Sequence, residues 1–185
     1  MNNELFYIVG IDPGSNVGVS IYGIDGYTLN IVTIETFVIP LENYIAPYAT
    51  DKLTSKLGYL SNIMLDICVR YNPLVLAVEE AFLNMKFPLA VMQLSQYLGI
   101  ILNTFVGYNP TIKVFKYAPR YVKRLFNAGG NADKDDMTKA LLTIDEITSK
   151  YNVVGLCEHE VDALAIGYVT LSECRRYPLV LYALV

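Results

Sequence analysis

The sequence predicts an α/β protein whose core is a five-stranded mixed sheet, with three antiparallel strands followed by two parallel strands, flanked by helices. Three observations lead to this prediction. Apolar, β-branched runs separated by tight-turn residues occupy the first part of the chain. Helical and strand-like periodicities alternate in the middle, and the last part is dominated by helical periodicity. Such an order gives a mixed sheet covered by helices.

The N-terminal strands are expected to form an antiparallel meander. Residues 5–11 are a continuous apolar run, which is typical of a strand buried on both faces. Residues 12–16 have turn chemistry, and residues 17–22 are again β-rich. Asp25-Gly26 favours a tight hairpin turn before a third strand over residues 29–39.

The remaining elements alternate between helix and strand. Helical periodicity places Met137, Leu141 and Ile144 on the inner face of one long helix. Helices are expected over residues 50–71, 88–106, 119–126, 133–149 and 158–174, and strands over residues 74–78 and 111–115. This order is the RNase H-like arrangement, and we expect residues 1–185 to form a single domain of that kind.

The composition excludes several classes of protein. Hydrophobic residues make up 54% of the chain and charged residues 17%, which argues against disorder. Three cysteines without CxxC spacing argue against a disulfide framework or a structural zinc site. No secretory signal pattern is expected at the N-terminus. The apolar stretch 88–107 contains Gln93, Gln96 and Asn103, so we expect a buried helix, no membrane span and a cytoplasmic protein.

Four ionisable residues stand at element boundaries: Asp12, Glu79, His159 and Asp162. Asp12 follows the first strand and Glu79 ends the fourth, so both carboxylates can emerge at one edge of the sheet. His159 and Asp162 are three residues apart on a predicted helix and share a face. Converging carboxylates repel one another unless a cation lies between them, and magnesium prefers oxygen ligands.

Each of these patterns also has a simpler interpretation. The Asp12 segment could be only a turn, Glu79 a solvated strand end, and His159 and Asp162 polar residues at the start of a helix. Their occurrence together, each at an element boundary, favours a site. An ATP-binding class whose phosphate loop also begins Asp-x-Gly needs two such domains, for which 185 residues are too few.

The same segments resemble the RuvC family of Holliday-junction resolvases from about residue 6 to residue 172. The matching segments are GIDPGS at 10–15 with Gly18 beyond, VEEAF at 78–82, YAPRYVK at 117–123, GGNADK at 129–134 and DALAIG at 162–167. The resemblance implies that Asp12, Glu79 and Asp162 bind metal. His159 falls where the family carries Asp or His, with Glu158 as its rival and Glu80 as the second choice beside Glu79.

The resemblance also implies residues that contact DNA. Phe82 aligns with an aromatic position used against bases, and Lys123 and Lys134 align with functional lysines, Lys134 as a catalytic residue as well; Arg120 lies in the same basic segment. Residues 113–139 carry seven basic and three acidic side chains, a net charge of +4, whereas the whole chain carries −4. A local basic surface beside an acidic site is what a nuclease requires.

The function that the resemblance implies is resolution of four-way DNA junctions by paired phosphodiester hydrolysis. It implies two Mg²⁺ ions per site, replaceable by Mn²⁺. A four-way junction is two-fold symmetric and needs two matched cuts, so we expect a homodimer, with the apolar face of the 88–106 helix as a candidate interface. A compact chain of this kind is compatible with a viral protein in a host cell. The alternatives are an RNase H-like nuclease for other branched DNA or structured RNA, and a non-catalytic DNA-binding module. The acidic net charge and the apolar segment 178–185 depart from the family pattern.

Overall fold

The computed structural model describes residues 5–47, 51–80, 88–126 and 134–177. The five strands form one sheet in the order β3-β2-β1-β4-β5. β1, β2 and β3 pair antiparallel, whereas β4 pairs parallel to both β1 and β5, which confirms the predicted mixed sheet. The strands are β1 (Leu5–Pro13), β2 (Val17–Asp25), β3 (Ile31–Ile39), β4 (Val75–Glu79) and β5 (Lys113–Tyr117).

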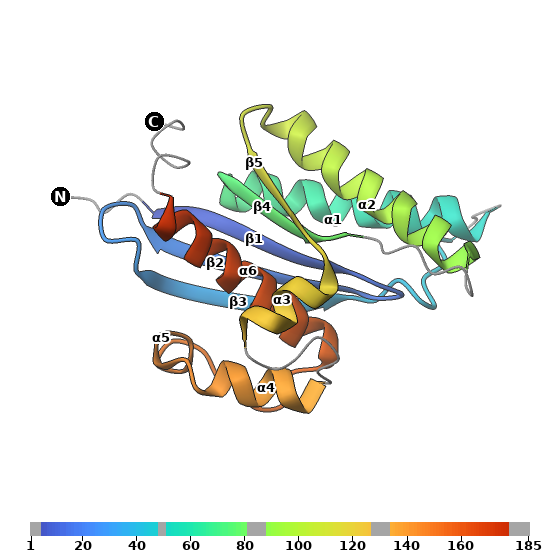
Figure 1. Ribbon diagram of the computed structural model, residues 1–185. Coiled ribbons are helices and arrows are strands. Elements are labelled where there is room, and N and C mark those ends of the chain that lie inside the picture. The colour runs from blue at the N-terminus through green and yellow to red at the C-terminus, as the bar shows by residue number, and fades with distance from the viewer. Residues whose placement is uncertain (1–4, 48–50, 81–87, 127–133, 178–185) are drawn as a thin grey trace.

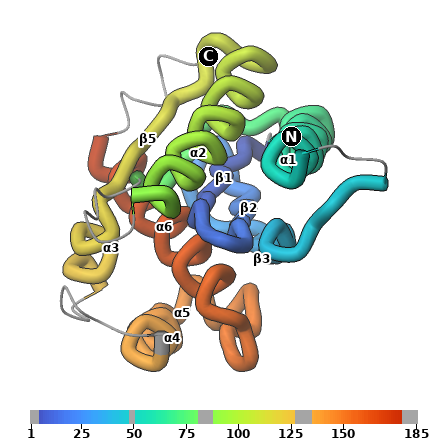
Figure 2. Tube along the Cα trace, turned by 90° about the vertical axis from the view of Figure 1, so that its right-hand side faces the viewer, coloured from blue at the N-terminus to red at the C-terminus, as the bar shows by residue number. Residues whose placement is uncertain are grey.

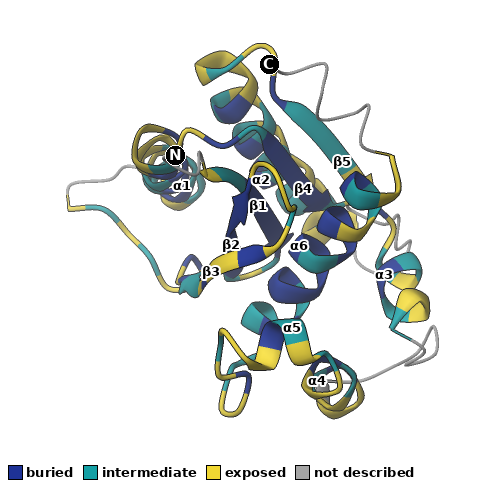
Figure 3. Ribbon diagram, turned by 90° about the vertical axis from the view of Figure 1, so that its left-hand side faces the viewer, coloured by how far each residue is buried: buried dark blue, intermediate teal, exposed yellow. Residues whose placement is uncertain are grey.

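Helices cover both faces of this sheet. They are α1 (Lys52–Tyr71), α2 (Pro88–Tyr108), α3 (Pro119–Leu125), α4 (Lys134–Leu142), α5 (Asp145–Thr148) and α6 (Glu158–Arg176). α1 and α2 lie together on one face, and α6 crosses the other face with α3, α4 and α5 beyond it (Figures 1 and 2). Each face has its own hydrophobic core, and the dark blue of buried residues follows the central strands β1 and β4 and much of α6 (Figure 3).

Local sequence signals explain where several elements begin and end. Asp51 caps α1, since its carboxylate accepts a 2.6 Å hydrogen bond from the Thr54 amide. Asn72 ends that helix in the left-handed conformation just before Pro73. Pro119 occupies the first turn of α3, where its missing N–H costs nothing. These are the positions at which the sequence predicted boundaries.

The single helix expected over residues 133–149 is wrong. Two helices, α4 and α5, occupy that range, and Ile144 lies between them with extended backbone angles. The Thr143 hydroxyl donates a 2.7 Å hydrogen bond to the Ala140 carbonyl and so competes with the helical backbone pattern. The break redirects the chain so that Ile147 is buried and Glu146 can reach α6.

α2 is only partly the buried helix that was expected. Its length and apolarity satisfy the criteria for a membrane span, but a core helix of a globular protein passes the same test. Tyr97, Ile101 and Phe105 pack with residues of α1 against the sheet. The opposite side of the helix is exposed, including Met92 and Val106.

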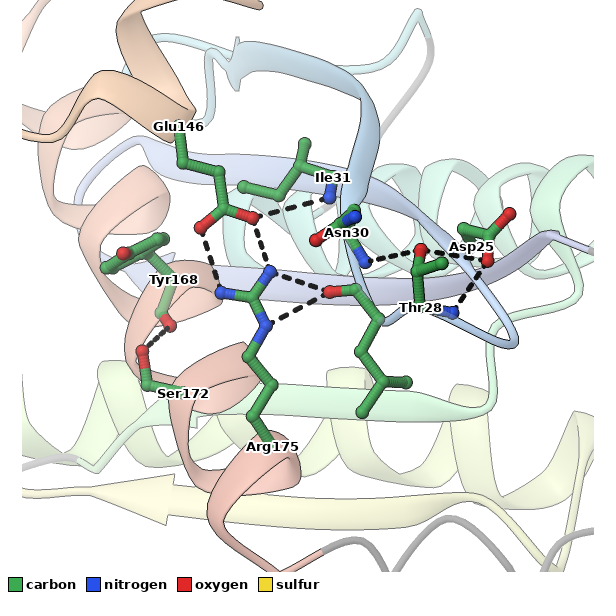
Figure 4. A network of polar contacts seen from close by, with 9 residues as sticks. Asp25, Thr28, Asn30, Ile31, Glu146, Tyr168, Ser172 and Arg175 are labelled. Atoms are coloured by element: carbon green, nitrogen blue, oxygen red, sulfur yellow. Dashed lines mark hydrogen bonds and ion pairs between the residues drawn. The ribbon is translucent and has the colours of Figure 1, made fainter.

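A polar network pins the C-terminal end of α6 to the β2–β3 turn (Figure 4). The Arg175 guanidinium donates hydrogen bonds to the Leu29 carbonyl and to the Glu146 carboxylate. Glu146 in turn accepts a hydrogen bond from the Ile31 amide. Leu29 has a φ of 57°, an uncommon angle for a side chain with a Cβ, and the two Arg175 contacts help to hold it there. α6 is therefore fixed at the end remote from Asp12.

Candidate active site

Strand register brings Asp12 and Glu79 next to each other. β1 and β4 are parallel neighbours, and the last pair in their register is Ile11 with Val78. The next residue of each strand is Asp12 and Glu79. Because side chains alternate between the two faces of a strand, residues that share a register position point to the same face. The expectation that both carboxylates emerge at one edge of the sheet is confirmed.

The same alternation decides which face they occupy. Ile8 and Val75 are register partners packed in the core beneath α6, and Asp12 and Glu79 each lie four residues further along. The residues that precede them in each strand, Ile11 and Val78, point to the opposite face and pack against α1 and α2. Asp12 and Glu79 therefore project toward α6, where His159 and Asp162 lie in the first turns of the helix.

Two buried hydroxyls fix α6 over this part of the sheet. Ser20 donates a 2.7 Å hydrogen bond to the carbonyl oxygen of Ala163. The Tyr22 phenol donates an equally short bond to the carbonyl oxygen of Leu164. Both acceptors immediately follow Asp162, so β2 determines how far along the sheet the acidic turn of α6 lies.

Glycines allow the helix to approach the strands this closely. A Cβ at Gly18, the register partner of Asp12, would overlap the carbonyl oxygen of His159. A Cβ at Gly10 would lie 2.7 Å from the Ala163 carbonyl oxygen. Gly10 and Gly18 belong to the first motif noted in the sequence, and their structural role is to admit the backbone of α6.

His159 is brought into direct contact with Asp12. Its Nδ1 lies 3.1 Å from Asp12 Oδ2; the Asp12 side chain is buried and the His159 ring is half-buried. The hydrogen bond with Asp12 raises the pKa of the His159 imidazole above its ordinary value. This hydrogen bond joins two of the four predicted site residues, although the two lie 147 positions apart in the chain.

Electrostatics show that Glu79 and Asp162 share the same site. Burial, followed by the charges of Asp12 and Asp162, raises the pKa of Glu79 to about 8. Burial and the charge of Asp12 raise the pKa of Asp162 to about 6. The positive charge of Lys123 opposes both shifts, which places the α3 lysine beside the acidic residues. The charge of Asp12 therefore acts on the ionisation of both Glu79 and Asp162.

The rival acidic residues are placed differently. Glu158 is exposed at the start of α6, and its charge contributes to the raised pKa of both His159 and Asp162. Glu80 is exposed beyond the end of β4, and its amide bonds to the Tyr117 carbonyl. The contact between His159 and Asp12 favours His159 over Glu158 as the fourth member of the site.

The donor chemistry suits a hard divalent cation. Asp12, Glu79 and Asp162 supply carboxylate oxygens from three separate elements, which is the ligand type that magnesium prefers. Within residues 5–47, 51–80, 88–126 and 134–177, no three His, Cys, Asp or Glu side chains are positioned closely enough to hold one ion.

The residues expected to contact DNA are described only in part. Arg120 is exposed on α3, and Lys123 on the same helix is half-buried beside the acidic site. Phe82 lies outside the described residues. Lys134 begins α4, but its side chain is not among those described.

Comparison with known proteins agrees with this arrangement. The five-stranded sheet with carboxylates on β1, β4 and the last helix defines a protein of the RNase H-like class. The family described as "Crossover junction endodeoxyribonuclease RuvC" matches residues 8–170. The chain belongs to this RuvC family.

Individual relatives cover most of the chain. A RuvC of Orientia tsutsugamushi (strain Ikeda) is 31% identical over 165 residues, covering 87% of this chain and 92% of the relative. One from Halothermothrix orenii is 30% identical, covering 86% and 88%. Thermus thermophilus RuvC in complex with a Holliday junction substrate superposes with a TM-score of 0.70 at 20% identity, covering 93% and 97%. The yeast mitochondrial resolvase Ydc2 gives 0.64 at 12% identity, covering 97% and 85%.

Replacing Gly18 with Ala should disturb the site through the backbone of α6. The added methyl overlaps the His159 carbonyl oxygen, so we expect a loss of about 1–3 kcal/mol of stability and a weaker contact between His159 and Asp12. Denaturant unfolding and the imidazole resonances of His159 would measure the two effects. Gly58→Ala is the control, because a Cβ there meets no described atom within 4 Å. This substitution should stabilise α1 by up to about 1 kcal/mol.

Metal-free protein should lose stability as pH rises. Glu79 ionises near 4.5 in the unfolded chain but near 8 in the folded protein, so folding takes up a proton between these values and is disfavoured as pH increases through them. Glu79→Gln removes this penalty. Urea unfolding in the presence of a chelator would measure this effect. The free energy of unfolding of the variant should rise relative to that of the wild type from about pH 5 to about pH 8. A difference that stays constant across that range would contradict the burial of an ionisable Glu79.

Proposed function

We propose that this protein is a metal-dependent endonuclease that resolves four-way DNA junctions by paired phosphodiester hydrolysis. The observation that carries the proposal is the meeting of Asp12 and Glu79 with His159 and Asp162 beneath the first turns of α6. Membership of the RuvC family and the fold shared with a RuvC solved on a Holliday junction support the choice of substrate.

Asp12, Glu79 and Asp162 would hold two magnesium ions, or manganese in their place. Such ions lower the pKa of a bound water and offset charge on the phosphate. The charge of Asp12 acts on both of the other acids, so Asp12 is the natural shared ligand. His159 contributes the imidazole that contacts Asp12 and can complete the site on that side.

Positive side chains around the site would hold the DNA. Lys123 already acts electrostatically on Glu79 and Asp162, and Arg120 is exposed one helical turn before it. We propose the same role for Lys134, which begins α4, and we propose that Lys134 also helps to offset charge on the phosphate. For Phe82 we propose a contact with a base.

We also propose that the protein acts in the cytoplasm, that of a host cell if it is viral.

We further propose that the active form is a homodimer joined through α2. This helix is apolar, yet only 17% of its most apolar 18-residue window is buried. Its exposed side carries Met92 and Val106 with the small residues Ser95 and Gly99 between them, which permits close approach of a second helix. A two-fold axis here would give two equivalent sites for two cuts in a two-fold junction.

Asp12→Asn should abolish cleavage of a synthetic four-way junction in magnesium while leaving junction binding in place. The amide loses the negative charge that a shared metal ligand requires. Gel analysis of cleavage should show a rate lower by about 100-fold or more, the order of loss measured when a group that stabilises charge in the transition state is removed. A flap, a hairpin and structured RNA assayed in parallel separate the junction resolvase from other nucleases. Equal cutting by the wild type and the variant contradicts the mechanism, and no cutting of any substrate by wild type favours a binding module.

Gly99→Lys should convert the dimer to a monomer. A Cβ at Gly99 meets no atom of the described residues within 4 Å, so the lysine leaves the fold intact but places charge where the second copy would pack. Sedimentation velocity would report the change in mass. Leu142→Lys is the control, since Leu142 is 42% exposed on α4 across the sheet from α2. A dimer that survives Gly99→Lys and dissociates with Leu142→Lys would locate the interface on the other face.

A further inference from the structure

Glu160 lies between the two proposed metal-binding residues of α6 but faces away from them. Neighbouring helical residues are about 100° apart, so Glu160 points to a different side from Asp162. Its Oε2 accepts a 3.0 Å hydrogen bond from the Cys157 amide, which completes a capping box at the start of α6. Its Oε1 accepts a 3.0 Å hydrogen bond from the Thr36 hydroxyl on β3.

These bonds connect the first turn of α6 to the far edge of the sheet. β3 is the edge strand two places from β1, so Glu160 cannot reach the carboxylates at the ends of β1 and β4. Thr36 is itself held, because its hydroxyl lies 2.9 Å from the phenol of Tyr151 in the segment before α6. Both oxygens of Glu160 are thus used to fasten the helix start from the side opposite Asp12.

We propose that Glu160 is a positioning residue that sets where His159 and Asp162 lie above Asp12 and Glu79; this inference rests on the proposed metal-dependent function. The rest of α6 has separate anchors, through Ser20 and Tyr22 in its middle and through the Arg175 network at its end. Loss of Glu160 therefore frees the first turn alone. That turn carries His159 and leads directly into Asp162, and metal ligands must be held to within about 0.5 Å of their working geometry.

The contact with β3 distinguishes this role from simple helix capping. A cap alone stabilises a helix start wherever the helix lies. The bond to Thr36 also fixes the helix start relative to the sheet that carries Asp12 and Glu79. Thr36→Val removes that bond but leaves the Cys157 cap, so the two contributions can be separated.

The test compares Glu160→Ala, Glu160→Gln, Thr36→Val and Glu146→Ala with the wild type. Glutamine can accept from the Cys157 amide with its oxygen and donate to the Thr36 hydroxyl with its nitrogen, so it should restore function. Glu146→Ala breaks the network at the other end of the same helix and is the matched control for lost stability.

Magnesium binding is measured by calorimetry on each protein, and cleavage of a four-way junction is titrated with magnesium. We expect Glu160→Ala and Thr36→Val to need roughly tenfold or more additional magnesium, the size of effect seen when a residue that orients metal ligands is removed. Junction binding in chelator should be unchanged. Glu160→Gln and Glu146→Ala should have the magnesium requirement of the wild type.

Hydrogen exchange of residues 157–163 gives a readout that does not depend on activity. Exchange should accelerate in Glu160→Ala and Thr36→Val and stay at the wild-type rate in Glu160→Gln and Glu146→Ala. The proposal is overturned if Glu160→Ala leaves both magnesium affinity and this exchange unchanged, or if Glu146→Ala shifts magnesium affinity equally. A wild type that neither binds magnesium nor cuts the junction would overturn the proposed function, while the exchange data still decide whether Glu160 holds the turn.

Discussion

The close seating of α6 on the β1–β2 hairpin is the contact on which the site depends. Gly18 lies directly beneath the His159 carbonyl and opposite Asp12, so the helix start and the first carboxylate meet with no side chain between them. Hydrogen bonds from Ser20 and Tyr22 to the carbonyls of Ala163 and Leu164 then fix the next turn of α6 against the sheet. An ordinary side chain at Gly18 would separate the two halves of the site while leaving the sheet itself unchanged.

This seating places negative charges where they oppose folding. The raised pKa values of Glu79 and Asp162 show that ionising the site is unfavourable in the folded protein, and burial is the larger cause for each. The fold tolerates this unfavourable free energy because α6 is held elsewhere by apolar packing and by the Arg175 network. Substitutions that remove these buried carboxylates would therefore stabilise the fold and disable the site, a common conflict between stability and activity.

Much of this arrangement could be predicted from the sequence, because the relevant signals are local. The apolar run before Asp12, the turn residues after it and the spacing of His159 to Asp162 each depend on a few neighbouring residues. The break between α4 and α5 could not be predicted, because helical periodicity continues through Thr143. The break is stabilised only by tertiary contacts, the burial of Ile147 and the bond of Glu146 to Arg175. The role of Glu160 could not be predicted for a similar reason, because its partner Thr36 is 124 residues away. For the same reason the motif glycines could be recognised, but the helix backbone that they admit could not.

The order of elements along the chain also determines when the site can exist. Asp12 and Glu79 are translated early, whereas His159 and Asp162 belong to the last element of the described fold. Chains emerge from the ribosome N-terminus first, and contacts between distant residues form late. A nascent chain that exposes the β1–β4 sheet therefore has only half of its acidic cluster, and hydrolytic capacity would arise only after α6 has been released and docked. Late assembly would keep incomplete chains from cutting nucleic acid during their own synthesis.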